Sequence, residues 1–203
     1  MAKAIGCLGI LCDMRKTSVR AAANVAVAAM PDLEQIAGVV LAGGRSSRMG
    51  RNKALLDYNG RPLVQHMVNL LQDLGLKNIF ISGQLEGYPC IEDDLSYAGP
   101  VQGIKSILKK KQGYKGYLFL PVDMPLLTVP MLEHLLAQEN GGYFIEWPLP
   151  AYITPPFVHF SGSSVYGFLE AQGIFPVQLP PAYEAAMRNI NTPEEWEDVV
   201  RTV

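Results

Sequence analysis

Hydrophobic positions along the chain fall into short continuous runs that alternate with longer sets at helical spacing. Residues 38–42 form an unbroken apolar run that stops at Gly43 and Gly44. A buried parallel strand ends in this way where it meets a ligand-binding loop. Similar short runs at 78–82 and 117–122 predict two more buried strands, and a further strand is expected at 175–179.

Helices are predicted between these strands, because apolar residues recur every three or four positions and helix-end signals flank them. Proline begins two of these segments, at Pro62 and Pro100, and the second ends in three lysines, as the helix dipole favours. The last helix begins with the capping box Thr192-Pro193-Glu194-Glu195. The expected helices cover residues 62–74, 100–111, the region of 132–136, 165–172 and 192–201.

Strands that alternate with helices of this size predict an α/β fold, with a mostly parallel sheet covered by helices on both faces. Ligands of such folds bind at the carboxyl ends of the strands. The proline-containing stretch 143–160 interrupts the alternation and predicts strands broken by irregular loop. No internal repeat or low-complexity linker divides the chain.

The first 35 residues differ from the rest, and we expect a domain of residues 36–203 preceded by an N-terminal extension, 1–35. Residues 4–12 superficially resemble a signal peptide, but Asp13 ends the apolar run after nine residues and no cleavage site follows directly. Residues 21–29 are rich in alanine. A poorly ordered extension, or a start codon assigned too far upstream, is one interpretation; a helix that packs on the domain or on a partner is the other.

Composition narrows the classes of function. The net charge of −2 over 203 residues provides no basic field for binding nucleic acid non-specifically. The nine-residue apolar run is far too short to span a bilayer. Three cysteines without a CxxC pair, and three scattered histidines, argue against a disulfide framework or a zinc site. We therefore expect a cytoplasmic protein that binds neither nucleic acid nor membrane.

The segment from Leu41 to Lys53 carries the clearest chemical signal. It combines adjacent glycines with Ser46, Ser47, Arg48 and the lysine. Glycine lets backbone N–H groups approach a phosphate closely, and the cationic side chains offset its charge. The spacing fits neither the GxGxxG dinucleotide fingerprint nor a Walker A loop. The segment therefore predicts a phosphate-binding loop of another kind.

The same segment resembles the signature of the molybdenum cofactor guanylyltransferase (MobA-type) family, LAGGxSxRMGxxKxLL, here LAGGRSSRMGRNKALL at 41–56. Three further segments resemble family motifs in the same order: GPVQGI at 99–104, PVDMP at 121–125 and NINTPEE at 189–195. The resemblance covers about residues 36–200. It implies a Rossmann-like three-layer α/β/α nucleotidyltransferase fold, and an enzyme that transfers the GMP part of GTP to the phosphate of molybdopterin with release of pyrophosphate.

The resemblance also implies the residues that bind the nucleotide and act on it. These are Leu41, Ala42, Gly43 and Gly44 through their backbone, Lys53 and Arg48 at the phosphates, and Asp123 as the ligand of Mg²⁺, with Mn²⁺ as the alternative metal. A carboxylate at the end of a buried strand suits a hard, mostly hydrated cation. An aspartate after a strand can equally be a turn residue.

Two further pairs of residues match the family's motifs. Asp93 matches a nucleotide-contacting aspartate, with Asp94 as the alternative one position later; either could be a simple loop carboxylate. Asn189 and Asn191 match asparagines near the acceptor pterin, although Asn191 could equally be the residue before a helix cap. His66, His134, Trp147 and Trp196 are expected to be packing or surface residues.

Alternative functions stay open at this stage. Family members often carry an asparagine after the second strand that contacts guanine, and this chain has Gln84 nearby. Related enzymes, such as a molybdopterin cytidylyltransferase or a sugar-phosphate or alcohol-phosphate nucleotidyltransferase, share the first loop. A nucleotide-binding assembly protein without turnover is a third reading. The family resemblance also implies transient contacts with other molybdenum-cofactor proteins, and a monomer or weak oligomer.

Overall fold

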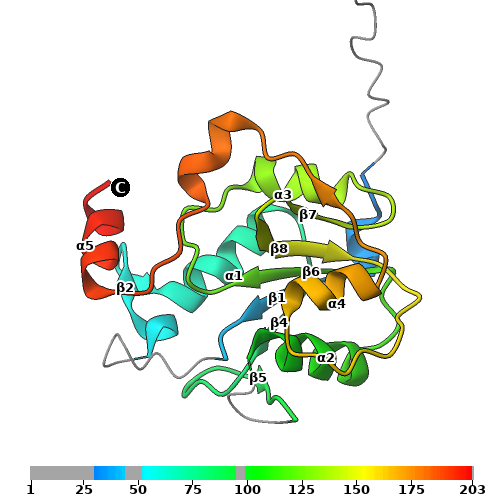
Figure 1. Ribbon diagram of the computed structural model, residues 1–203. Helices are drawn as coiled ribbons and strands as arrows, with labels where there is room; N and C mark the ends of the chain where they lie inside the picture. The colour runs from blue at the N-terminus through cyan, green and yellow to red at the C-terminus, as the bar shows by residue number, and fades with distance from the viewer. Residues whose placement is uncertain (1–29, 44–51, 95–98, 203) are drawn as a thin grey trace, which may run out of the picture.

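A mixed sheet of seven strands forms the middle layer of the protein (Figure 1). The computed structural model describes residues 30–43, 52–94 and 99–202. The strand order is β5 (Cys90–Ile91), β4 (Asn78–Ser82), β1 (Ile36–Leu41), β6 (Gly116–Pro121), β8 (Trp147–Ile153), β7 (Gly142–Phe144) and β9 (Pro176–Val177). Neighbouring strands are parallel except that β8 runs antiparallel to both β6 and β7.

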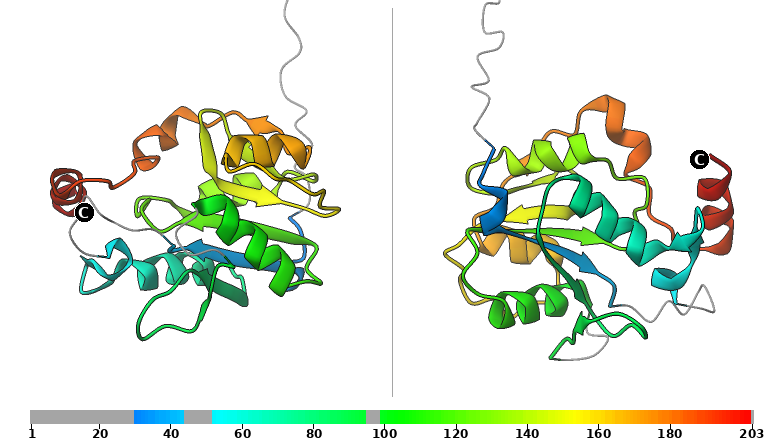
Figure 2. Two further views of the ribbon diagram at one scale, coloured as in Figure 1. Left: turned by 60° about the horizontal axis from the view of Figure 1, so that its bottom comes forward. Right: turned by 180° about the vertical axis from the view of Figure 1, so that it is seen from behind.

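Helices cover both faces of this sheet. On one face lie α1 (Leu63–Asp73) and α3 (Val129–Leu136), and on the other lie α2 (Pro100–Lys110) and α4 (Val165–Ala171). The two opposite views in Figures 1 and 2 show this arrangement, with α1 and α3 nearest the viewer when the molecule is seen from behind. The three-layer α/β/α fold with a mostly parallel mixed sheet is therefore confirmed.

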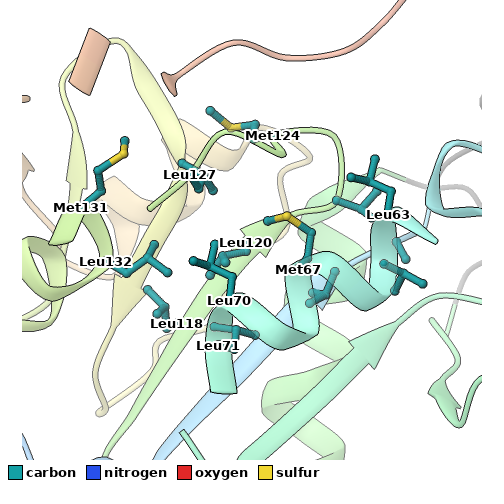
Figure 3. Close-up of a cluster of buried hydrophobic side chains, with 14 of the residues drawn as sticks. Leu63, Met67, Leu70, Leu71, Leu118, Leu120, Met124, Leu127, Met131 and Leu132 are labelled. Atoms are coloured by element: carbon teal, nitrogen blue, oxygen red, sulfur yellow. The ribbon is translucent and has the colours of Figure 1, made fainter. Parts of the chain in front are cut away.

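The larger core lies between the sheet and the face that carries α1 and α3. Alternate residues of the central strands face it, among them Val40 of β1 and Leu120 of β6. Met67 of α1 packs among these side chains, and both it and Leu120 are fully buried (Figure 3). Because a strand directs successive side chains to opposite faces, the intervening residues, such as Val39, enter the smaller core under α2 and α4. Burial on both faces explains why these strands are uninterrupted apolar runs.

The helix α5 (Pro193–Thr202) lies at the edge of the molecule, beside the short hairpin of β2 (Asp57–Tyr58) and β3 (Arg61–Pro62) (Figure 1). The ring of Trp196 in α5 lies 6.0 Å from that of Tyr58, and Tyr58 in turn lies 4.6 Å from the ring of His66 in α1. This aromatic row attaches the C-terminal segment to the larger core.

The capping box predicted at the start of α5 is confirmed. The backbone N–H of Glu195 donates to Thr192 Oγ1 at 3.2 Å, and the N–H of Thr192 donates to Glu195 Oε2 at 3.0 Å. The two side chains thus satisfy backbone donors that the helix leaves without an internal partner.

Replacing Thr192 with alanine is expected to lower the free energy of unfolding by about 1 kcal/mol, because one N–H loses its acceptor. For a domain of this size, that corresponds to a fall in Tm of roughly 2–4 °C. Thr128 provides a matched control, since it precedes α3 but makes no side-chain cap hydrogen bond. Calorimetry should therefore show a smaller fall for Thr128→Ala; equal falls would contradict the assignment.

The sequence predicted the long elements better than the short ones. The strand expected at 175–179 is confined to Pro176–Val177, because only two residues pair with β7. The helix expected around 132–136 begins earlier, at Val129, with a proline in its first turn. The short β2, β3 and β5 carried no recognisable pattern, and the interrupted strands expected in 143–160 are β7 and β8.

The described residues also form the 3-10 turns η1 (Leu33–Gln35), η2 (Lys53–Leu55) and η3 (Pro181–Ala186).

Residues before Ile36 already contact the domain. In η1, Leu33 packs against the larger core and Glu34 forms an ion pair with Lys77. Most of the predicted N-terminal extension, residues 1–29, lies outside the described residues. Within the described part of the chain, no helix is long and apolar enough to cross a membrane.

Candidate functional site

A cleft of about 350 Å³ opens at the carboxyl ends of the two central strands, β1 and β6. From β1 the chain continues to β4 on one side of the sheet, and from β6 it continues to β7 and β8 on the other. Open α/β sheets bind their ligands where the strand order diverges in this way. The cleft is lined by the first loop (Leu41, Ala42 and Gly43), by Lys53, by Asp123 and by Trp147, among others.

Backbone hydrogen bonds fix the start of the first loop. The N–H of Ala42 donates to the carbonyl oxygen of Ser82 at 2.9 Å, and the carbonyl oxygen of Leu41 accepts from Val122 at 3.1 Å. These bonds extend the ladder of the sheet beyond the end of β1, on both sides. The backbone that precedes Gly43 is therefore held rigidly at the edge of the cleft. Gly44 and Arg48, also expected to act, lie outside the described residues.

Close packing at this edge requires glycine. Gly83 has φ +131°, and a Cβ there would lie 2.8 Å from the backbone nitrogen of Gly43. At Gly43 itself, the backbone would accept alanine, but the added Cβ would lie 2.9 Å from Asp93 Oδ2. Thus two glycines and one carboxylate meet within van der Waals distance, where β1 and β4 end.

The two neighbouring aspartates differ in their surroundings. Asp93 is half-buried and accepts a hydrogen bond from the buried Ser82 hydroxyl at 2.8 Å. Asp94 is exposed, and its carboxylate pairs with Lys109 at 2.9 Å and Lys110 at 2.8 Å. The hydrogen bonds from Lys110 and Lys109 hold the pKa of Asp94 below its usual value. Of the two alternatives, only Asp93 therefore lies beside the glycine loop.

Lys53 joins three of the segments that the sequence singled out. Its Nζ donates to Asn191 Oδ1 at 2.9 Å and lies 3.3 Å from Asp123 Oδ2. The side chain of Lys53 is 14% exposed and that of Asp123 is 26% exposed, so both open toward the cleft from a largely buried position. Residues 70 and 138 positions away along the chain thus meet at one ammonium group.

The segment that carries Asn191 is fixed from both ends. The N–H of Ile190 donates to the carbonyl oxygen of Asp123 at 2.9 Å, and the N–H of Asn191 donates to Glu195 Oε2 at 2.5 Å. Asn191 is therefore the residue before the helix cap, and its side chain is also a partner of Lys53. Asn189 is exposed and lines the cleft.

The residues of the cleft suit a hydrated divalent cation better than a fully protein-bound one. Among the described residues, no group of three or more histidine, cysteine, aspartate or glutamate side chains could hold a metal. Asp123 is a single carboxylate, with the amide oxygen of Asn191 close to the same lysine. Mg²⁺ commonly uses one or two carboxylates and takes its other ligands from water and substrate phosphates. The donor set therefore fits such an ion.

Trp147 is the site residue that sequence reasoning passed over. It was expected to be a packing or surface residue, and it is half-buried and lines the cleft. This tryptophan, which precedes two prolines, belongs to no recognisable motif, so the sequence alone does not indicate a functional role. By contrast, His66 Nε2 donates a hydrogen bond to the Pro125 carbonyl oxygen at 2.9 Å, and His134 stacks on Phe144, both outside the cleft lining.

Fold and site together describe an α/β protein with a cleft at the carboxyl edge of its sheet, where a lysine and an aspartate lie in contact beside the first loop. Residues 38–167 match the family described as the MobA-like NTP transferase domain. The chain is 34% identical, over 80% of its length and 93% of the relative's, to the molybdenum cofactor guanylyltransferase of Xanthomonas euvesicatoria pv. vesicatoria (strain 85-10). This chain belongs to the MobA-like NTP transferase family and is a nucleotidyltransferase.

Solved structures agree on the fold. A nucleotidyl transferase from Methanothermobacter thermautotroptrophicus superposes with a TM-score of 0.64 at 15% identity, over 83% of this chain and 97% of that one. The molybdopterin-guanine dinucleotide biosynthesis protein A of Archaeoglobus fulgidus superposes with a TM-score of 0.57 at 19% identity, over 82% and 97% of the two chains. At these identities, the likeness concerns the arrangement of strands and helices.

Proposed function

We propose that this chain transfers the GMP part of GTP to the terminal phosphate of molybdopterin, which yields the guanine dinucleotide form of the cofactor and pyrophosphate. The contact of Lys53 with both Asp123 and Asn191 carries this proposal, because it joins at one point the segments expected to hold the nucleotide, the metal and the acceptor. The guanylyltransferase named among its relatives matches 80% of the chain.

The reaction needs little acid–base chemistry from the protein. A phosphate oxygen of the acceptor attacks the α-phosphorus of GTP, and the bond from that phosphorus to the oxygen bridging the β-phosphorus breaks. The electron pair leaves with pyrophosphate. The nucleophile is largely ionised at neutral pH, so no strong general base is required. In keeping with this, no histidine is found among the described residues that line the cleft.

The main barrier is the repulsion between an anionic acceptor and a polyanionic nucleotide, so catalysis depends on positioning and charge. Lys53 would place its ammonium group at the reacting phosphates, held in position by Asn191. Asp123 would hold Mg²⁺, with Mn²⁺ as the alternative ion. When bound, such an ion would orient the phosphates and offset their charge. Arg48 would assist the departure of pyrophosphate.

The nucleotide would lie across the ends of β1 and β4. The backbone of Leu41, Ala42, Gly43 and Gly44 would contact the nucleotide, with the N–H of Ala42 already donating to Ser82. The side chain of Asp93, beside Gly43, would offer an acceptor to the nucleoside. Gln84 follows β4 and is exposed, so its amide can reach a base edge. We expect Asn189 and Asn191 to contact the acceptor at the other side of Asp123.

Replacing Gly43 with alanine is expected to weaken GTP binding about 10-fold, because the new Cβ forces Asp93 Oδ2 away from its position 2.9 Å distant. The melting temperature should change little, since the glycine is exposed. Calorimetric titration with GTP measures the effect. Asp93→Ala serves as the comparison, and it should weaken GTP binding to a similar degree, because either change removes the carboxylate from this position. If Gly43→Ala binds GTP as the wild type does, Asp93 is not fixed there.

The same proposal describes the setting of the enzyme. We expect residues 36–203 to act as one nucleotidyltransferase domain preceded by an extension, residues 1–35. We expect it to work in the cytoplasm as a monomer or weak oligomer, and to meet other molybdenum-cofactor proteins transiently. The free thiol of Cys90 is compatible with a reducing compartment.

Pyrophosphate release tests the function when each component is varied in turn. Wild-type protein with Mg²⁺, GTP and molybdopterin should release pyrophosphate, and omission of any one of them should stop it. CTP in place of GTP should support less than a tenth of the rate, as a rough expectation from base recognition by hydrogen bonds. A preference for CTP would show that the reaction is cytidylyl transfer and not guanylyl transfer. If no nucleotide led to release of pyrophosphate, the proposal would be contradicted.

A further inference from the structure

Trp147 begins β8, the strand that pairs with β6 on the side away from β1. In this antiparallel pair, Phe119 is opposite Ala151 and Leu118 is opposite Tyr152. Asp123 follows the end of β6, and both Asp123 and Trp147 line the cleft. A tryptophan and the carboxylate therefore border the same cleft.

The order of the strands divides the site into two halves around Asp123. On the side of β4 lie Gly43 and Asp93, which are in contact at the end of β1. On the side of β8 lie Trp147 and the apolar Leu149. The first half offers backbone donors and a carboxylate, whereas the second offers a broad apolar surface.

The indole is fixed rather than loosely attached. Part of it packs against the larger core, and the remainder faces the cleft. The residue before it, Glu146, has φ +69°, in the left-handed region that side chains rarely occupy. The adjacent N–H of Ile145 donates to the carbonyl oxygen of Val177 at 3.0 Å. The two-residue turn that joins β7 to β8 requires this conformation, and Phe144 pairs with Trp147 across it, so the turn fixes the start of β8.

Trp147 is the only aromatic side chain among the residues that line the described cleft. A ring system such as a pterin is flat and polarisable, and it gains most from contact with a large aromatic face. The other half of the site already holds the groups suited to the nucleotide. We propose that Trp147 is a specificity-determining residue whose indole stacks on the heteroaromatic ring of the acceptor, and so directs the acceptor phosphate toward Asp123 and Lys53.

This inference rests on the proposed function, and it predicts a selective effect on the acceptor. Trp147→Ala should raise the KM for molybdopterin about 10- to 100-fold, the loss expected for one aromatic stacking contact. The KM for GTP should change less than about twofold. Trp147→Phe, which keeps an aromatic ring, should restore most of the acceptor affinity. A purely structural role would instead change both KM values and kcat together.

Fluorescence gives a reading that does not depend on turnover. The chain has two tryptophans. The second, Trp196 of α5, is buried against Tyr58 of β2. In Trp196→Phe, all tryptophan emission comes from Trp147, and molybdopterin should quench it in a saturable manner. In Trp147→Phe, the same titration should quench much less. Titration with GTP alone should leave the emission of Trp147 nearly unchanged.

The outcomes separate this inference from the function on which it rests. If the wild type transfers GMP but Trp147→Ala keeps a normal KM for molybdopterin, the stacking contact is wrong and the enzyme assignment stands. If no transfer occurs but molybdopterin saturably quenches Trp147, the contact stands and the reaction is wrong. Should Trp147→Ala fail to fold, the titration of Trp196→Phe decides, and absence of quenching there overturns the inference.

Discussion

Replacing Asp123 with asparagine is expected to lower the rate of guanylyl transfer about 100- to 1,000-fold, while the fold is retained. The substitution keeps the shape of the side chain and removes the charge that would hold a divalent cation. Asp123 is partly exposed to the cleft, and its backbone carbonyl still accepts from Ile190, so the local chain should keep its path. Initial rates of pyrophosphate release with saturating GTP and molybdopterin measure the effect.

Asp94→Asn is the matched control. It makes the same chemical change on an exposed carboxylate that pairs with Lys109 and Lys110. Surface pairs of this kind contribute little, so the rate should stay within about twofold of the wild type. Higher Mg²⁺ concentrations should recover part of the activity of Asp123→Asn. Wild-type turnover by Asp123→Asn would show that this carboxylate does not hold the ion.

Replacing Lys53 with methionine is expected to reduce kcat to a similar degree, about 100-fold or more, because the phosphates lose a positioned cation. Methionine has nearly the same length and keeps contact with the apolar surroundings. Unlike Asp123→Asn, this variant should gain nothing from added Mg²⁺, since its defect lies in the protein's own charge. Single-turnover measurements separate this loss from a change in nucleotide binding.

Lys77→Met controls for the loss of one positive charge. Lys77 is exposed and pairs with Glu34, far from the cleft in the fold. The rate of Lys77→Met should equal that of the wild type. The hydrogen bond with Glu34 raises the pKa of Lys77, so this variant, like Lys53→Met, removes a paired charge. A normal kcat for Lys53→Met would mean that the contacts of Lys53 with Asp123 and Asn191 serve only the structure.

Long elements could be predicted from the sequence because their patterns reflect burial. The residues 78–82 alternate between the faces of a covered sheet, and the observed strand β4 has these bounds. The two-residue strand β5 could not be predicted, because so short a segment has no period and owes its conformation to its neighbour. The strand β9 was predicted too long, because only two of its residues pair with β7. The antiparallel direction of β8 is likewise a property of the tertiary pairing.

The site, too, could be predicted only in part. The motifs assigned Lys53, Asp123 and Asn191 to one site, and Lys53 is in contact with the other two. The direction in which Asp93 points could not be derived, because it depends on the Ser82 hydroxyl and on the lack of a Cβ at Gly43. Trp147 could not be identified either, since its place in the cleft arises from the pairing of β8 with β6.

Transfer of a radioactive label tests the central claim most directly. Wild-type protein is incubated with Mg²⁺, molybdopterin and GTP labelled either at the α-phosphate or at the γ-phosphate. The account predicts that the α-label moves to the pterin product, whereas the γ-label appears only in pyrophosphate. Transfer of the γ-label to the acceptor, or release of labelled GMP without a pterin product, would contradict guanylyl transfer at this site.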